Sequence, residues 1–329
     1  MPKRVGILGT FVWDTIWTLE DQAAGRPFES WGGVAYSLAA GAAALPRGWE
    51  IVPIAKVGAD LFGEAHRYLD TLEGVGPRAG LVRVAQANNR VELRYLDAER
   101  RGERLTGAVP GWTWEELAPV LEGLDALYLN YFSGWETDLE TARRIAREFR
   151  GPVYADLHSL FLGPPGEGPR EPRPLPDWEE WLACFDVVQL NEDERRLLGA
   201  STDPRSVPAE LLRHGPDAVL VTLGPAGAVY AARPYADSRP GLRGGPRLED
   251  GGGRVLARRV DGGDPTGCGD AWGAAVFAGL LGGLSLEHAV TRATALAAAK
   301  MGHRGATGLY RHLRRTADAW ARSPIDAPP

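Results

Sequence analysis

Residues 261–283, DGGDPTGCGDAWGAAVFAGLLGG, contain the pattern that best indicates the fold of this chain. A segment at 255–260, which we predict to be a strand, leads into a Gly-Cys-Gly sequence at 267–269. An apolar run at 271–281 follows and predicts a buried helix. A glycine-rich loop between a strand and a buried helix is typical of α/β proteins that bind anionic ligands.

This loop has the chemistry of an anion site next to a base. Glycines let backbone N–H groups approach a ligand, and the start of a helix adds the positive end of its dipole. We therefore expect the amides of Gly267, Cys268 and Gly269 to form an anion hole. Asp270 follows directly, and a carboxylate beside an anion can accept a proton, as phosphoryl transfer to a hydroxyl requires. The alternative is that Asp270 caps the helix.

The rest of the chain alternates short apolar runs with segments that have helical spacing. The runs predict buried strands at 5–8, 51–57, 126–129, 153–155, 187–190 and 218–223. The segments predict helices at 33–44, 61–72, 140–149 and 207–213. This order predicts an α/β fold with a doubly wound, mostly parallel sheet flanked by helices. In such sheets ligands bind at the carboxyl ends of the strands.

Two segments, at about 15–31 and 82–106, interrupt this alternation. The second segment contains a strand-like pattern, with a hairpin turn expected near Arg101 and Gly102. We expect the two segments to form a small separate sheet.

The composition of the 329 residues excludes several classes of protein. A hydrophobic content of 44% and a charged content of 24% are typical of a globular chain. With 43 acidic and 37 basic side chains, the net charge of −6 predicts no nucleic-acid partner and no anionic membrane partner. Two cysteines, no signal-peptide pattern and no apolar run of about 18 residues predict a cytoplasmic protein without a membrane span.

Several catalytic motifs have no match in the sequence. There is no H-E-x-x-H zinc motif, no G-x-x-x-x-G-K-[ST] loop and no G-x-S-x-G elbow. The glycine pattern after the first predicted strand is too short for a dinucleotide-binding oxidoreductase. The segment DLHS at 156–159 follows a predicted strand, and we expect it to line the ligand cleft.

The segment DPTGCGD at 264–270 resembles the D-T-x-G-A-G-D signature of the ribokinase-like (PfkB) carbohydrate kinases. Pro265 replaces the usual threonine and Cys268 the usual alanine, and neither change removes a required side chain. Four further segments resemble family motifs in the same order along the chain: GGVAYSLA at 32–39, GADLFG at 58–63, NEDE at 191–194 and VTLGPAG at 221–227. The resemblance covers about residues 4–310 and implies a single ribokinase-like domain over 1–329.

The resemblance implies roles for residues near the acceptor substrate. Asp14, Gly32, Gly33 and Ser37 match substrate-binding positions, although Ser37 stands where the family has asparagine. Arg90 is a further candidate for contact with a sugar or a phosphate, and the alternative is a solvated charge. The resemblance also implies that Asp270 is the catalytic base.

The resemblance also implies a site for the phosphate donor. Asn191, Thr222, Gly224 and Gly227 match ATP-binding positions, and Asn191 and Glu194 match residues that organise Mg²⁺ through water.

A monovalent cation such as K⁺ is a further expectation from the family. Asp264, with the carbonyl groups of Thr266 and Gly305, resembles a monovalent-cation site, but residues 303–307 match its last part poorly.

The small sheet has an implied role as well. In the family it forms a lid over the substrate, and it often joins two copies of the chain into a homodimer. Trp13, Trp17 and Trp31 fall in or near this region, together with Tyr36. They are interpreted either as packing residues or as stacking partners for a nucleobase.

These inferences predict an ATP-dependent phosphotransferase that acts on a primary hydroxyl of a sugar or sugar-like molecule. A nucleoside kinase of the same fold is the alternative within this class. A non-catalytic sensor of sugars or nucleotides is the alternative outside it, although a sensor has no need for the base at Asp270.

Overall fold

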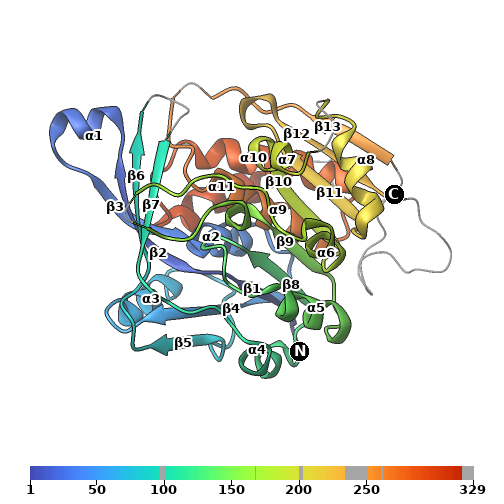
Figure 1. Cartoon of the computed structure of the whole chain (residues 1–329), viewed down its shortest axis with the longest axis horizontal. Coiled ribbons are helices and arrows are strands. Elements are labelled where there is room, and N and C mark those ends of the chain that lie inside the picture. Colours follow the sequence, from blue (N-terminus) through green and yellow to red (C-terminus); the bar gives the residue numbers. More distant parts are fainter. Residues whose placement is uncertain (97–100, 167, 200–202, 234–250, 261, 321–329) are drawn as a thin grey trace.

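The computed structural model describes residues 1–96, 101–166, 168–199, 203–233, 251–260 and 262–320. A nine-stranded sheet carries helices on both faces, and a separate four-stranded sheet stands to one side of it (Figure 1). This arrangement confirms the predicted α/β fold with a doubly wound, mostly parallel sheet. None of the helices among the described residues is long and apolar enough to cross a membrane.

The large sheet contains all six strands that the apolar runs predict. In spatial order its strands are β13 (Gly251–Val255), β12 (Ala228–Ala232), β11 (Ala218–Thr222), β10 (Val187–Asn191), β9 (Val153–Asp156), β8 (Ala126–Asn130), β1 (Lys3–Leu8), β4 (Trp49–Gly58) and β5 (Leu81–Val84). The sheet is parallel from β11 to β5, and β12 is antiparallel to both of its neighbours.

Helices cover both faces because side chains alternate along each strand. In β1, Val5 and Ile7 belong to one apolar cluster and Leu8 to the other. The first face is covered by α2 (Val34–Ala44), α3 (Phe62–Leu69), α9 (Cys268–Leu281), α10 (Leu286–Lys300) and α11 (Leu309–Trp320). The second face is covered by α4 (Trp114–Leu121), α5 (Leu139–Glu148), α6 (Trp178–Ala183), α7 (Glu192–Leu197) and α8 (Val207–Leu211). Short 3₁₀ helices complete the connections: η1 (His158–Phe161), η2 (Leu212–His214) and η3 (Gly224–Ala226).

The small sheet is built from the two irregular segments. Its strand order is β3 (Phe28–Gly33), β2 (Phe11–Trp17), β6 (Arg90–Tyr95) and β7 (Arg101–Thr106). A short helix that the sequence analysis missed, α1 (Leu19–Ala24), connects β2 to β3 and projects from the body of the molecule (Figure 1). Val12, Ile16, Val91, Leu93 and Leu105 form a third apolar cluster on one face of this sheet.

Four predicted boundaries are wrong. The first irregular segment begins too late, because the small sheet already includes Phe11 at the start of β2. The second irregular segment begins too early, because residues 82–84 belong to β5 and pair with β4 in the large sheet. Arg101 and Gly102 pair with Tyr95 and Arg94, so both belong to β7 rather than to a turn. The strand expected at 255–260 is β13 at Gly251–Val255, where an edge strand accommodates three glycines that indicate a loop in the sequence. Asp261, in the opening motif, lies outside the described residues.

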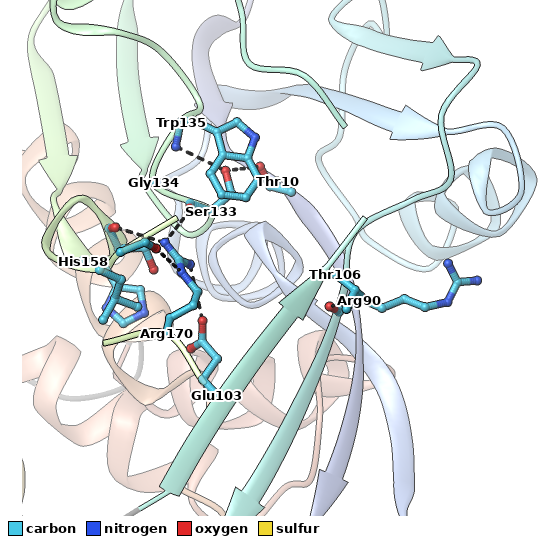
Figure 2. Close-up of polar contacts among 12 residues, drawn as sticks. Thr10, Arg90, Glu103, Thr106, Ser133, Gly134, Trp135, His158 and Arg170 are labelled. Atoms are coloured by element: carbon cyan, nitrogen blue, oxygen red, sulfur yellow. Dashed lines mark hydrogen bonds and ion pairs between the residues drawn. The ribbon is translucent and has the colours of Figure 1, made fainter. Parts of the chain in front are cut away.

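Arg170 attaches the small sheet to the loops of the large one. Its side chain is buried and donates to the carbonyl oxygens of Ser133 (2.8 Å), Gly163 (3.0 Å) and Ser159 (3.3 Å). It also lies 3.4 Å from the carboxylate of Glu103 on β7 (Figure 2). One guanidinium therefore joins β7 to the loops that follow β8 and β9.

Candidate active site

Polar side chains end four neighbouring strands of the large sheet. Asn130, Asp156, Asn191 and Thr222 are the last residues of β8, β9, β10 and β11. Asn130 is in register with Asp156, and Asn191 is in register with Thr222. Because these strands are parallel, the four residues lie along one edge of the sheet. This is the edge at which α/β proteins bind their ligands.

Asp270 lies in the first turn of α9 with its side chain turned toward β8. The residue is 8% exposed, and its carboxylate accepts a hydrogen bond of 2.6 Å from the amide of Asn130. The same amide group donates to the Ser37 hydroxyl (3.1 Å), which in turn donates to the backbone carbonyl of Asp270 (3.3 Å). Gly267 is the N-cap residue of α9, so the alternative that Asp270 caps the helix is wrong. Asn130 holds one carboxylate oxygen in place.

The loop before α9 contains a tight turn at Gly267. Its φ of 77° is left-handed, and a Cβ at this position would lie 2.3 Å from the Tyr36 ring on α2. Only glycine combines this backbone conformation with this close approach. The Cys268 amide donates to the Pro265 carbonyl (3.1 Å) and closes the turn. Among the described residues the amides of Gly267 and Gly269 donate no hydrogen bond; Gly267 is buried, whereas Gly269 is exposed.

His158 and Glu194 form an ion pair next to this loop. Nδ1 of His158 is 3.2 Å from a carboxylate oxygen of Glu194, and the His158 side chain is 26% exposed. Burial lowers the pKa of His158, but the hydrogen bond and charge of Glu194, with the charges of Asp156 and Asp270, raise it overall to about 10. The imidazole is therefore a cation at neutral pH. The position of the 156–159 segment at this edge supports its expected place in the cleft.

Asp156 is a buried carboxyl group at the end of β9. Its pKa is raised well above the usual range, first by burial and then by the charges of Glu194 and Asp270, against the opposing charge of His158. Gln189 donates to its carboxyl group (2.9 Å) and to the carbonyl of Gly269 (3.2 Å). The edge of the sheet is thereby tied to the loop before α9.

The predicted ATP-binding residues lie together at the end of β10 and β11. Asn191 caps α7, and its side-chain oxygen accepts hydrogen bonds from the amides of Asp193 and Glu194 (both 2.9 Å). Gly224 begins η3 and Gly227 follows its last residue, with φ angles of 53° and 94°, which a glycine adopts without strain.

The structure allows a test of the predicted magnesium ligands. One oxygen of the Glu194 carboxylate accepts the Asn191 backbone N–H (2.8 Å), and the other is bonded by the Asn191 side-chain amide and His158. No group of three His, Cys, Asp or Glu side chains converges on one point among the described residues. Both Glu194 oxygens therefore already accept hydrogen bonds, so direct coordination by this carboxylate is blocked, and Mg²⁺ would have to be held through its own waters.

Three of the predicted substrate residues lie in the small sheet: Asp14 in β2, and Gly32 and Gly33 in β3. Asp14, in the middle of β2, is 1% exposed, and a Cβ at Gly32 would lie 1.9 Å from its carboxylate. Gly33 has a φ of 59°, and a Cβ there would lie 2.3 Å from the Thr10 carbonyl. Both glycines are thus required where β3 packs against β2 and enters α2. Ser37 is engaged with Asn130 and Asp270 rather than with the small sheet.

Arg90 does not share a face with Asp14. In the β2–β6 pairing Asp14 is opposite Val91, whereas Arg90 is opposite Trp13. Adjacent residues of a strand point to opposite faces. Arg90 forms an ion pair with Asp60 (2.8 Å) and points away from His158 and Arg170 (Figure 2). The alternative of an exposed charge therefore fits Arg90 better than a substrate contact.

Comparisons with known proteins agree with this geometry. The family model for pfkB family carbohydrate kinases matches residues 19–312. The chain belongs to this family. No curated protein matches the chain.

Solved structures show the PfkB fold over nearly the whole chain. Ribokinase from Thermotoga maritima is 20% identical with a TM-score of 0.70, over 98% of this chain and 100% of that chain. A nucleoside kinase from Burkholderia thailandensis in complex with inosine is 18% identical with a TM-score of 0.69, over 96% and 98%. Fructokinase with bound ATP from Xylella fastidiosa is 18% identical with a TM-score of 0.71, over 98% and 100%.

The predicted monovalent-cation site does not fit K⁺ in this PfkB-family chain. The ammonium of Lys300 lies 2.9 Å from the Asp264 carbonyl and 3.3 Å from its carboxylate. Burial raises the pKa of Asp264, but the charge of Lys300 and the hydrogen bonds of Thr266 lower it overall. Gly305 presents its N–H, not its carbonyl, to the same carboxylate (3.4 Å). A side-chain cation and a backbone donor therefore already neutralise the group that K⁺ would need.

Sequence analysis missed three residues of this site. Asn130 is a polar residue at the end of an apolar run, a signal that could have been used. Tyr95 donates to or accepts from the Thr266 hydroxyl (2.9 Å), and nothing in the sequence pairs these two residues. Lys300 ends an alanine-rich helix, where a lysine is ordinary.

Proposed function

We propose that the chain is an ATP-dependent kinase that phosphorylates a primary hydroxyl of a sugar or sugar-like molecule. The observation that supports this most strongly is the Asp270 carboxylate, held by Asn130 at 2.6 Å in the first turn of α9, next to the Gly267 and Gly269 amides, which donate no hydrogen bond among the described residues. A fixed proton acceptor beside an anion hole is the arrangement that phosphoryl transfer to a hydroxyl requires.

The acceptor would bind between the small sheet and this loop. Asp14, Val91 and Tyr95 lie on the same face of the small sheet, because Asp14 pairs with Val91 and Tyr95 follows at an even spacing. The Tyr95 hydroxyl reaches Thr266 in the loop before α9. The Asp14 carboxylate therefore lies on the face that meets the loop, where it would accept hydrogen bonds from substrate hydroxyls. In this position the small sheet would act as a lid that excludes water.

The donor would bind on the other side of the loop, over β10 and β11. A surface pocket of about 540 Å³ lies beside η3. It is lined by Glu192, Asp203, Pro204, Arg205, Leu223, Ala226, Val229 and Arg254. This volume is in the range of small-molecule sites and suits the base and ribose of ATP. The phosphates would then extend past Asn191 toward the amides of Gly267 and Gly269.

In the proposed reaction Asp270 accepts the proton of the substrate hydroxyl as its oxygen attacks the γ-phosphorus. The new oxygen–phosphorus bond forms as the bond to the β-phosphate oxygen breaks, and ADP leaves. The amides of Gly267 and Gly269 stabilise the charge on the transferred group, and the His158 cation adds to the positive potential. When bound, Mg²⁺ neutralises phosphate charge, and Asn191 and Glu194 would hold it through water.

Trp13 and Trp31 do not support the alternative of a nucleobase stacked beside Asp14. Trp13 and Trp31 are paired on the face of the small sheet opposite Asp14 and contact each other edge to face, with ring centroids 5.3 Å apart. Trp31 also packs on Phe11 (5.2 Å) and Tyr68 (6.5 Å). These rings are therefore packing residues and do not stack on a ligand beside Asp14.

The test is an assay of ADP release with Mg²⁺–ATP over a panel of pentoses, hexoses, keto-acid sugars and nucleosides, with identification of the phosphorylated product. We expect acceptor-dependent ADP release with at least one sugar. Activity with nucleosides alone would favour the nucleoside kinase. Binding of ATP without transfer to any acceptor would favour the sensor and contradict the proposal.

A further inference from the structure

Lys300 is an unusual residue for its position. It ends α10, and its side chain is fully buried, with 0% of the residue exposed. A buried ammonium costs free energy unless opposite charge and hydrogen-bond acceptors surround it. The buried lysine therefore indicates that a positive charge has a role at the end of α10.

The surroundings of the ammonium have the chemistry of a cation site. Lys300 donates to the backbone carbonyl of Asp264 (2.9 Å) and to its carboxylate (3.3 Å). Its Nζ also lies 5.4 Å from the centre of the Tyr36 ring, within the range of a cation–π interaction. The C-terminal end of α10 supplies the negative end of a helix dipole.

This cation lies at the start of the loop that leads to Asp270. Asp264 accepts the Thr266 N–H on its carboxylate (2.9 Å) and donates its own N–H to the Met301 carbonyl (3.0 Å). Gly267 then packs against the same Tyr36 ring that faces Lys300. The ammonium, the ring and the loop thus form one packed unit, in which the charge of Lys300 balances Asp264 and holds the path of the loop.

We propose that Lys300 is a positioning residue that supplies a built-in cation to the anion-hole loop, so that the enzyme needs no dissociable monovalent cation. A K⁺ ion in contact with Asp264 would lie within a few ångströms of the ammonium, and two like charges repel strongly in a buried site. The effect on activity rests on the proposed function, whereas the effect on stability does not.

Two variants separate the charge of Lys300 from its volume. Lys300→Ala removes the ammonium and leaves space for an ion, whereas Lys300→Met removes the charge and keeps the space filled. The melting temperature of the wild type and of both variants is measured in KCl, NH₄Cl and choline chloride at equal ionic strength. We expect the wild type to melt at the same temperature in all three salts. Lys300→Ala should melt lower in choline and regain stability in K⁺ or NH₄⁺, and Lys300→Met should melt lower in every salt.

Activity is the second readout. The rate of ADP release by the wild type should be unchanged when choline replaces K⁺. Lys300→Ala should lose activity by about 10²-fold in choline and recover part of it in K⁺ or NH₄⁺, as expected when the loop that positions the reacting groups is displaced. Lys300→Met should lose activity without rescue.

The proposal is contradicted if wild-type activity or stability depends on K⁺, or if Lys300→Met matches the wild type. It is also contradicted if Lys300→Ala folds and responds to no cation. Should neither variant fold, the wild type in K⁺ and in choline still decides whether a dissociable cation is needed. Cation-dependent melting of Lys300→Ala, in a protein that phosphorylates no acceptor, would support this inference and reject the proposed function.

Discussion

At the residue scale, the amide of Asn130 holds the carboxylate of Asp270. Asn130 uses its amide group both for the Asp270 carboxylate and for the Ser37 hydroxyl. Its role would be to keep the carboxylate aimed at the acceptor hydroxyl, since misplacement of a reacting group costs much of the rate.

Asn130→Ala should therefore lower kcat by about 10²-fold and leave the KM for the acceptor nearly unchanged. Ser37→Ala is the matched control, because it removes a contact to the backbone of Asp270 and leaves the carboxylate bond in place. We expect it to lower kcat less than tenfold. Steady-state kinetics on both variants check this, and an equal loss in the two would contradict a role for Asn130 in aiming the carboxylate.

The raised pKa of His158 predicts that the stability of the fold depends on pH. Burial lowers its pKa, but Glu194 and the neighbouring carboxylates raise it overall from 6.5 to about 10. A histidine with a raised pKa in the folded state stabilises the fold fully below pH 6.5 and loses this contribution as the pH rises through 10. As the pH is raised from 6.5 to 10, we therefore expect the melting temperature of the wild type to decrease relative to that of His158→Gln. A difference that stays constant over this range would show that His158 titrates normally.

At the element scale, the turn before α9 depends on how closely it approaches α2. Gly267 and Gly283 have similar left-handed φ angles of 77° and 83°. A Cβ at Gly267 would lie 2.3 Å from the Tyr36 ring, whereas a Cβ at Gly283 would meet nothing within 4 Å.

Gly283→Ala is therefore a control for the backbone strain alone, which costs about 1–2 kcal/mol. Gly267→Ala should lower the free energy of unfolding by more than this and should also reduce kcat, because the turn carries the amides of the proposed anion hole. Urea denaturation and kinetics on the two variants check the prediction. Equal stability losses would show that the approach to Tyr36 is unimportant.

The strands of the large sheet could be predicted because each depends on a local apolar run. The glycines of β13 give no such signal, and only pairing with β12 makes that segment a strand. Register is also non-local. Asp14 and Arg90 are both plausible substrate residues in the sequence, but the pairing of β2 with β6 places them on opposite faces.

At the scale of the whole molecule, the position of the small sheet depends on Arg170. The residue lies in a proline-rich loop and bridges Glu103 on β7 to carbonyl groups of the large sheet (Figure 2). Burial lowers its pKa, and the charge of Glu103 opposes this.

Arg170→Met keeps most of the volume but leaves Glu103, two buried carbonyl groups and the half-buried carbonyl of Gly163 without their donor. We expect the free energy of unfolding to fall by about 3 kcal/mol. Arg67→Met, which breaks an exposed ion pair with Glu64, is the control and should change it by less than about 1 kcal/mol. Urea unfolding measures both. A loss from Arg170→Met no larger than the control would show that this network does not hold the small sheet.

The long-range contacts of the site could not be predicted from the sequence. Lys300 is 36 positions from Asp264, and Tyr95 is 171 positions from Thr266. Their contacts arise from the packing of whole elements, which local patterns do not report. The order of the family motifs along the chain allowed three residues to be chosen as site candidates: Asp270, Asn191 and Thr222. The structure places them along one side of the sheet. A homodimer through the small sheet stays a prediction.

The central claim is that Asp270 is the base of a phosphoryl transfer. Asp270→Asn keeps the shape of the side chain and removes its ability to accept the proton. Asp70→Asn, which removes an exposed carboxylate paired with Arg78, is the matched control. With the acceptor found in the panel, we predict that Asp270→Asn lowers acceptor-dependent ADP release by about 10²–10⁴-fold at an unchanged melting temperature, and that Asp70→Asn retains full activity. Near-normal turnover by a folded Asp270→Asn protein would contradict this account.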